Sequence, residues 1–193
     1  MGDALSVLQG VNVNGRINFP RFSIALTAAD RFCEDCAAGR LEAVQQKLAN
    51  KSAEEKAKFV CAKSREGDVP LNCAAHSGNL ELVDLLLESG ASLTDYDKEG
   101  HSALCSAILG GHPQVLQRLV EKGGELNHQD DSGLAAVHYA VLRENVECAK
   151  ILLEAGANPN LKNKNGTMAF QQARVLKNQQ IQELLKQHGA IES

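Results

Sequence analysis

Six cysteines and six histidines are the residues of this chain that could hold a metal or carry redox chemistry. Cys33 and Cys36 have the CxxC spacing of zinc sites and redox-active thiol pairs, but no second such pair follows. No two histidines have the spacing of a zinc-binding pair. The remaining cysteines are scattered along the chain: Cys61, Cys73, Cys105 and Cys148. We therefore predict six free structural thiols and no metal or other cofactor, with a redox role of the Cys33–Cys36 pair as the alternative.

Catalytic motifs are also missing from the sequence, which contains no P-loop, GxSxG elbow, HExxH pair or dinucleotide fingerprint. His138 could activate the Cys105 thiol only if the fold brought the two side chains together. They stand 33 residues apart, at equivalent positions of the repeat described next. Stacked repeats bring such pairs close as a matter of packing. We predict that the protein is not an enzyme.

A repeat of 33 residues positions these side chains, and two sets of glycines mark it. The first set is Gly67, Gly100, Gly133 and Gly166. The second set begins Gly-Ala or Gly-Gly pairs at residues 90–91, 123–124, 156–157 and 189–190. A period of this length is typical of stacked-repeat proteins, in which each unit buries its apolar face against its neighbours. Such folds offer an extended surface, so we expect a binding protein.

Each unit contains two apolar segments with helical spacing. The first segment includes a small residue that lets two helices approach closely: Ala74, Ala107, Ala140 and Ala173. The second segments, residues 82–87, 115–120 and 148–153, have a broad apolar stripe. The glycine after each of them can adopt the positive φ that ends a helix, and a polar turn follows. The expected unit is therefore a turn, a short helix, a tight turn and a longer helix.

In this pattern the chain resembles the ankyrin-repeat family. The family has a glycine followed by Thr-Pro-Leu-His and alanine, then Val-x-x-Leu-Leu and Gly-Ala, and the resemblance covers residues 30–190. Pro70 and His138 keep the family's proline and histidine, whereas three histidine positions differ: Asn72, Cys105 and Gln171. The resemblance implies an all-α solenoid of about five helix-turn-helix units with hairpin turns between them. Because that histidine usually bonds across the turn in the family, the changed units should be less stable than consensus repeats.

The predicted array occupies residues 30–193. Its units lie near residues 30–63, 64–96, 97–129, 130–162 and 163–193. The outer two units carry polar residues in columns that are apolar elsewhere: Asp35, Lys47, Gln182 and Lys186. Because a terminal repeat needs a polar outer face, we expect these units to be caps and the array to be complete.

Six extra residues separate the first two units, within residues 50–63. Ser52 and Glu55 have the spacing of a capping box, which predicts a short helix over about residues 53–60. Residues 47–65 carry six basic and two acidic side chains, a net charge of +4 in a chain of −4. This basic segment is either a solvated surface helix or a docking element for an acidic partner.

Residues 1–29 form an extension before the array. Apolar and polar residues alternate around Asn14 and Gly15, which predicts a β-hairpin over residues 11–19. At the end of the extension, Thr27 and Asp30 indicate the N-cap of the first helix.

Composition narrows the partners and the location. The net charge of −4 argues against nucleic-acid binding, and no stretch approaches the roughly 20 apolar residues of a membrane span. The chain does not open with a signal-peptide pattern, and unpaired cysteines indicate a reducing compartment. We expect a monomer in the cytoplasm, the nucleus or both.

The resemblance also implies where a partner would bind. In ankyrin repeats, partner contacts usually come from the turns and the end of the first helix, which together form a concave face. The matching side chains here are Tyr96, Lys98, His101, Leu109, Gln129, Asp131, Leu134, Leu142 and Arg143. The apolar members of this set predict a hot spot inside a charged rim, unless the leucines pack against neighbouring turns. The predicted function is an adaptor or inhibitor that binds another protein.

The alternative is a structural spacer, or a substrate of asparaginyl hydroxylation. Ankyrin repeats commonly serve as targets of such hydroxylases, at a turn asparagine six residues before the glycine. Asn127 and Asn160 hold that position here, each with a leucine eight residues upstream. A mass increase of one oxygen on peptides that contain either asparagine would identify this modification.

Overall fold

The computed structural model describes residues 26–192. Within that range the chain forms eleven α-helices, and its β-structure is limited to an isolated bridge between Lys162 and Met168. The helices are α1 (Ala28–Ala37), α2 (Leu41–Ala49), α3 (Ala53–Val60), α4 (Pro70–Ser77), α5 (Leu80–Glu88), α6 (Ala103–Gly110), α7 (Pro113–Glu121), α8 (Ala136–Leu142), α9 (Val146–Glu154), α10 (Ala169–Val175) and α11 (Gln179–Gln187). The prediction of an all-α fold is confirmed. The hairpin predicted for residues 11–19 lies outside the described residues.

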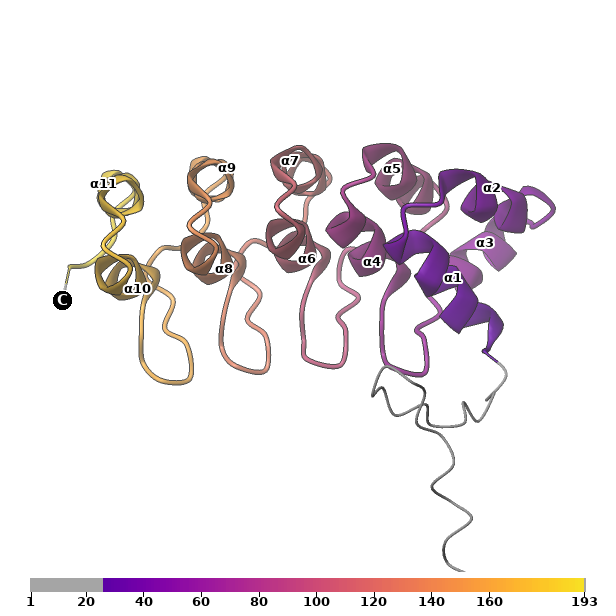
Figure 1. Ribbon diagram of the computed structural model, residues 1–193, viewed down its shortest axis with the longest axis horizontal. Helices are drawn as coiled ribbons and strands as arrows, with labels where there is room; N and C mark the ends of the chain where they lie inside the picture. The colour runs from indigo at the N-terminus through magenta and orange to yellow at the C-terminus, as the bar shows by residue number, and fades with distance from the viewer. Residues whose placement is uncertain (1–25, 193) are drawn as a thin grey trace, which may run out of the picture.

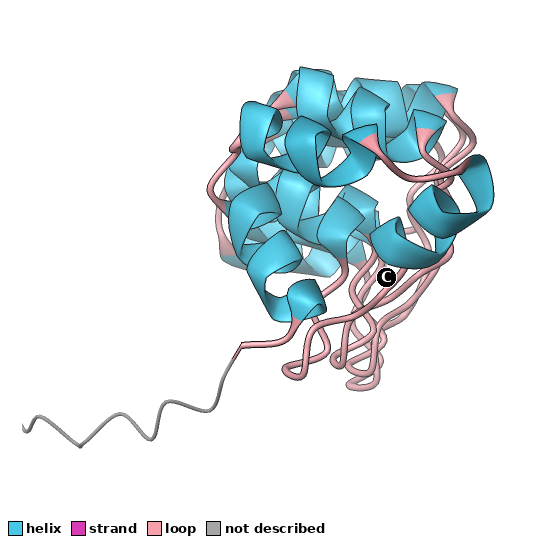
Figure 2. Ribbon diagram, turned by 90° about the vertical axis from the view of Figure 1, so that its right-hand side faces the viewer, coloured by secondary structure: helices cyan, strands magenta, loops and turns pink. Residues whose placement is uncertain are grey.

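The helices are arranged in two rows (Figure 1). The first helices of the units, α1, α4, α6, α8 and α10, contact one another in that order, and so do the second helices α2, α5, α7, α9 and α11. Viewed along the array, the loops between units project together from the side of the first helices (Figure 2). The result is an elongated molecule with two helical layers and a row of hairpin loops along one edge.

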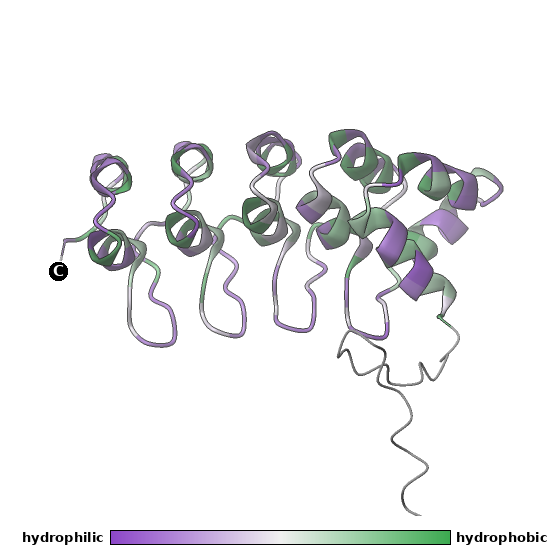
Figure 3. Ribbon diagram, in the orientation of Figure 1, coloured by the Kyte–Doolittle hydropathy of each residue, from purple (hydrophilic) through white to green (hydrophobic). Residues whose placement is uncertain are grey.

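The core is a continuous strip between the two rows of helices. Two columns of fully buried residues run along it. The first helices contribute Ala74, Ala107, Ala140 and Ala173, and the second helices contribute Leu86, Leu119, Leu152 and Leu185. Apolar residues accordingly gather in the helices (Figure 3). Each unit completes its core only against its neighbours, so its stability depends on them.

Short polar side chains begin many of the helices. The predicted cap of α1 is confirmed: Thr27 Oγ1 accepts the Asp30 amide at 3.1 Å, and Asp30 Oδ2 accepts the Thr27 amide at 2.7 Å. The capping box at the start of α3 is confirmed as well. Three of the second helices have an asparagine as N-cap. In each of them the asparagine Oδ1 accepts the backbone amide three residues on, at 3.0–3.1 Å. These caps are Asn79, Asn145 and Asn178.

The polar residues of the outer units have specific partners. The carboxylate of Asp35, buried in α1, accepts hydrogen bonds from Lys47 on α2 and, at 2.8 Å, from Arg40 between the two helices. These cations, Lys47 most strongly, hold the pKa of Asp35 below its ordinary value. At the other end of the array, Gln182 donates to the carbonyl of Ala173 at 3.1 Å. The two changes in the first unit therefore compensate each other in the folded chain.

The extra residues between the first two units form α3, which covers the predicted range. Phe59 on α3 contacts Phe32 on α1, with ring centroids 4.7 Å apart. Part of the positive charge of residues 47–65 is engaged within the chain, in the ion pairs Lys47–Asp35, Lys58–Glu54 and Arg65–Asp30. The segment thus packs on the array, which favours the interpretation as a surface helix.

Candidate interaction surface

One side chain caps the turn of each of the last three hairpin loops. The capping residues are Asp97, Asp130 and Asn163. In each case Oδ1 accepts the backbone N–H groups of the residues two and four positions on, at 2.7–3.0 Å. The backbone N–H of the glycine three residues on also bonds to the carbonyl of the capping residue, at 2.9–3.1 Å. The turns therefore hold the side chains at their tips in fixed positions.

Neighbouring hairpins are joined through main-chain atoms. The amide of Asp131 donates to the carbonyl of Glu99 at 3.1 Å, and the amide of Lys164 donates to the carbonyl of Ser132 at 3.0 Å. We call this series of contacts the hairpin ladder. Together with the adjacent first helices it forms a single surface, which we call the hairpin face.

A polar network connects two hairpins to a first helix in the middle of this face. The ring of His101 has Asp97 Oδ2 at 3.1 Å from Nδ1 and the Tyr139 hydroxyl at 2.9 Å from Nε2. The Tyr139 hydroxyl also donates to Oδ2 of the buried Asp130. Burial, followed by this bond to Asp130, raises the pKa of Tyr139. The network fixes the orientation of His101 and links the third unit to the fourth.

Three possible metal ligands lie within 4.8 Å of one another, on the side chains of Asp97, Glu99 and His101. The Asp97 carboxylate, however, already accepts two turn amides through Oδ1 and faces the His101 ring through Oδ2. The hydrogen bonds of the turn therefore account for this grouping.

His138 is fully buried at the start of α8, and both nitrogens of its ring form hydrogen bonds with backbone groups. Nδ1 accepts the Ala135 amide at 3.1 Å, so Nε2 carries the proton and donates to the Leu161 carbonyl at 3.0 Å. Burial lowers the pKa of His138 below its ordinary value of 6.5. In the last unit, Gln171 stands at this position and accepts the Met168 amide at 2.9 Å. One of the bonds made by the histidine is thus kept where the residue differs.

The ring of Tyr96 is held against the next hairpin loop along the array. It stacks on the ring of His128 with centroids 3.7 Å apart, and its hydroxyl donates to Glu125 at 2.7 Å. Burial is the main cause that raises the pKa of Tyr96 to about 12. Tyr96, a member of the predicted binding set, therefore joins two neighbouring hairpin loops through its side chain.

The other predicted binding residues divide by exposure. Leu109 and Leu134 are half-buried, as expected if they pack against neighbouring turns, whereas Leu142 is 46% exposed. The polar members Lys98, Gln129, Asp131 and Arg143 are exposed, and His101 is half-buried. Of the four predicted apolar contacts, Leu142 is the most exposed to solvent.

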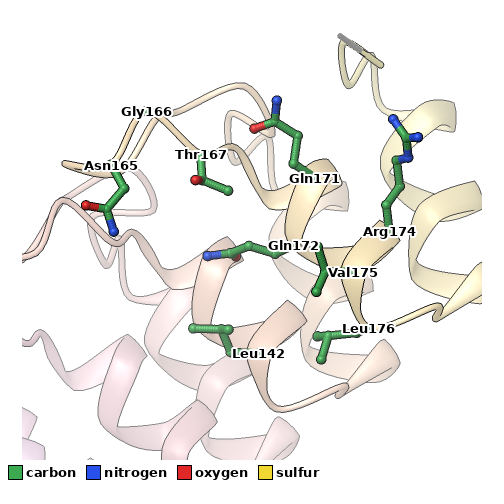
Figure 4. A pocket seen from close by; sticks show the side chains of 9 residues that line it. All are labelled: Leu142, Asn165, Gly166, Thr167, Gln171, Gln172, Arg174, Val175 and Leu176. Carbon is green, nitrogen blue, oxygen red and sulfur yellow. The ribbon is translucent and has the colours of Figure 1, made fainter.

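Leu142 has two exposed apolar neighbours from the next unit. Leu142 ends α8, while Val175 ends α10 and Leu176 follows it; Val175 is 81% exposed and Leu176 is 38% exposed. These side chains line an open cavity of about 800 Å³ between the ends of α8 and α10 (Figure 4). Other residues that line it are Asn165, Thr167 and Gln172. We call this cavity the α8–α10 hollow.

A model of one protein family matches the sequence of this array. The family model described as ankyrin repeats (3 copies) matches residues 33–130, 74–163 and 111–192. The chain belongs to the ankyrin-repeat family. No curated protein sequence matches it. Ankyrin repeats are generally protein–protein interaction modules and are typically not enzymes. None of the helices formed by residues 26–192 has the length and apolar character needed to cross a membrane.

The two turn asparagines of the ankyrin array make contacts between adjacent loops. Oδ1 of Asn127 accepts the Asn158 amide at 2.8 Å, and Oδ1 of Asn160 accepts the Ile191 amide at 2.8 Å. The side-chain amide of Asn160 also donates to the carbonyl of Gly189 at 2.9 Å. Both asparagines therefore stabilise the stacking of the ankyrin loops.

The thiols of the ankyrin array lie in different surroundings. Cys36 is fully buried, and burial raises its pKa to about 12. Cys33 lies beside Cys73 of the next unit, and the hydrogen bond from the Cys73 thiol lowers the pKa of Cys33. Burial raises the pKa values of Cys105 and Cys148 to about 11. The CxxC pair therefore consists of two thiols in unlike environments.

Proposed function

We propose that this ankyrin-repeat protein is an intracellular adaptor or inhibitor that binds another protein through the hairpin face. The observation that carries the proposal is the exposure of Leu142, which is followed in the chain by the exposed Arg143 and shares a cavity with polar residues such as Asn165 and Gln172. Large apolar side chains ringed by polar ones are the composition of binding hot spots. The hairpin ladder supports the proposal because it sets side chains from successive units at fixed spacings on one surface.

Hydroxylation of Asn127 or Asn160 is the less favoured alternative. Both side chains accept a hydrogen bond from the following loop. A modification that disturbed these bonds would compete with the stacking of the array.

Site-specific photo-crosslinking in cells tests the proposed function. A photoreactive amino acid is placed at Gln129 or Asp131, which are exposed on the hairpins, and in control variants at Gln117 or Glu147, which are exposed on the second helices. We expect a crosslinked protein of one defined mass from the hairpin positions and none from the control positions, because the partner contacts the hairpin face. Crosslinks that form only from Gln117 and Glu147 would show that the binding surface lies on the opposite side.

A further inference from the structure

The α8–α10 hollow gathers exposed apolar side chains that are separate elsewhere. Leu142, Val175 and Leu176 line it together, whereas Leu26 and Ile191, the other large apolar side chains that are exposed among residues 26–192, lie near the two ends of the described chain. Single exposed apolar residues are ordinary on protein surfaces, but clusters of them mark interaction sites. The hollow therefore has an apolar floor of the kind that marks an interaction site.

A hydrogen-bonding group stands at the edge of this floor. The side chain of Gln172 extends from α10 toward α8, and its Oε1 is buried without a hydrogen-bond partner among the described residues (Figure 4). Asn165 and Thr167 lie at the hairpin side of the same cavity. Buried acceptors are normally paired, so a ligand that supplies an N–H group to Gln172 Oε1 would satisfy it.

The rim of the hollow is positively charged. Four exposed basic residues line it or adjoin its lining residues in the chain: Arg143, Lys164, Arg174 and Lys177. None of them forms an ion pair within residues 26–192. Two exposed acidic residues also lie near the rim: Glu144, which follows Arg143, and Asp131, which precedes the Ser132 whose carbonyl accepts the Lys164 amide. This local excess of positive charge stands out in a chain whose net charge is −4.

We propose that the hollow binds a short acidic segment of a partner protein, which inserts two neighbouring large apolar side chains between α8 and α10. The inference deepens the proposed function and rests on it. The apolar side chains would cover Leu142, Val175 and Leu176, while carboxylates of the segment would face the basic rim. The volume of about 800 Å³ lies within the roughly 300–1,000 Å³ that is common for ligand sites.

Other occupants match these features less well. Nucleic acid would meet the basic rim, but the apolar floor offers no contact to phosphate. A second copy of the chain, placed symmetrically on the hollow, would bring two rims of the same charge together. An acidic apolar segment satisfies the floor and the rim at once.

The test uses the full chain and fluorescent peptides that each carry two leucines and several glutamates, with binding measured by anisotropy. Matched peptides have lysine in place of glutamate, or serine in place of leucine. We expect both changes to weaken binding about tenfold or more, because each removes one of the two recognition elements. Val175→Asp should weaken binding of the acidic leucine peptides to the same degree. Leu26→Asp, the same change at an exposed apolar residue distant from the hollow, should leave it unchanged.

Several results would overturn the inference. These are equal binding of the glutamate and lysine peptides, full binding by a folded Val175→Asp variant, tighter binding of a single-stranded RNA oligonucleotide, and self-association that Val175→Asp abolishes. Failure of the peptides to bind, while Gln129 and Asp131 still crosslink to a partner, would reject the hollow and leave the proposed function in place. Crosslinks confined to the second helices would reject both.

Discussion

Replacing Gly133 with alanine should lower the free energy of unfolding by about 3 kcal/mol, measured by urea denaturation followed by circular dichroism. Gly133 has φ +75°, a left-handed conformation that side chains disfavour. A Cβ atom added to it would also lie 2.7 Å from the backbone nitrogen of Lys164 and 3.0 Å from the carbonyl carbon of Asn163. The added methyl group would therefore push apart two hairpins of the ladder.

Gly166 provides the matched control, because it holds the same position one unit later. Its φ is +76°, but among the described residues no heavy atom outside its own turn lies within 4 Å of an added Cβ. Gly166→Ala should therefore lower the free energy of unfolding by only about 1 kcal/mol, the effect of backbone strain alone. Equal losses for the two variants would show that the approach of neighbouring hairpins contributes little.

Replacing His138 with alanine should also destabilise the array strongly, by about 2–4 kcal/mol. The change leaves the Ala135 amide and the Leu161 carbonyl without the partners that the imidazole provides, and it opens a cavity at a fully buried position. His138→Gln is the matched control, because Gln171 occupies the same position in the last unit and keeps the bond to the preceding amide. A loss as large for glutamine as for alanine would contradict this account.

The stability of the parent chain relative to His138→Gln should also depend on pH. Burial lowers the pKa of His138 in the folded state, so below pH 6.5 the unfolded chain binds a proton that the folded chain excludes. The stability that neutral His138 contributes is complete above its unfolded pKa and is lost as the pH falls toward its folded pKa. The difference in unfolding free energy between the parent chain and His138→Gln should therefore shrink between pH 7.5 and pH 5. A difference that grows on acidification would mean that His138 is charged in the folded state.

The periodic part of the fold was predictable because it depends on residues with strong local requirements. Glycines such as Gly100 and Gly133 stand where the backbone has positive φ, so their spacing marks the turns. The capping box of Ser52 and Glu55 likewise predicts α3, because both of its hydrogen bonds form within one turn of helix. Family membership follows from these signals.

The candidate site was less predictable because exposure depends on neighbours that are distant in sequence. Leu109, Leu142 and Val175 hold the same position in successive units, yet Leu109 is half-buried and Val175 is 81% exposed. The pairing of Asp35 with Lys47 could not be predicted for a similar reason, because in the sequence each residue is only a polar residue at a position that is apolar in other units. Register identifies which residues are equivalent, and packing decides what each of them contacts.

The hairpin ladder has a consequence for how this surface can diversify. Its contacts join amide to carbonyl, from Asp131 to Glu99 and from Lys164 to Ser132, and use no side-chain atom. Side chains at the loop tips can therefore be exchanged without loss of these bonds, whereas an inserted or deleted residue would shift the pairing of that loop with its neighbours. Selection or engineering for a new partner should accept many residue types at the tips, apart from the capping residues and the glycines of the turns, and little change in loop length.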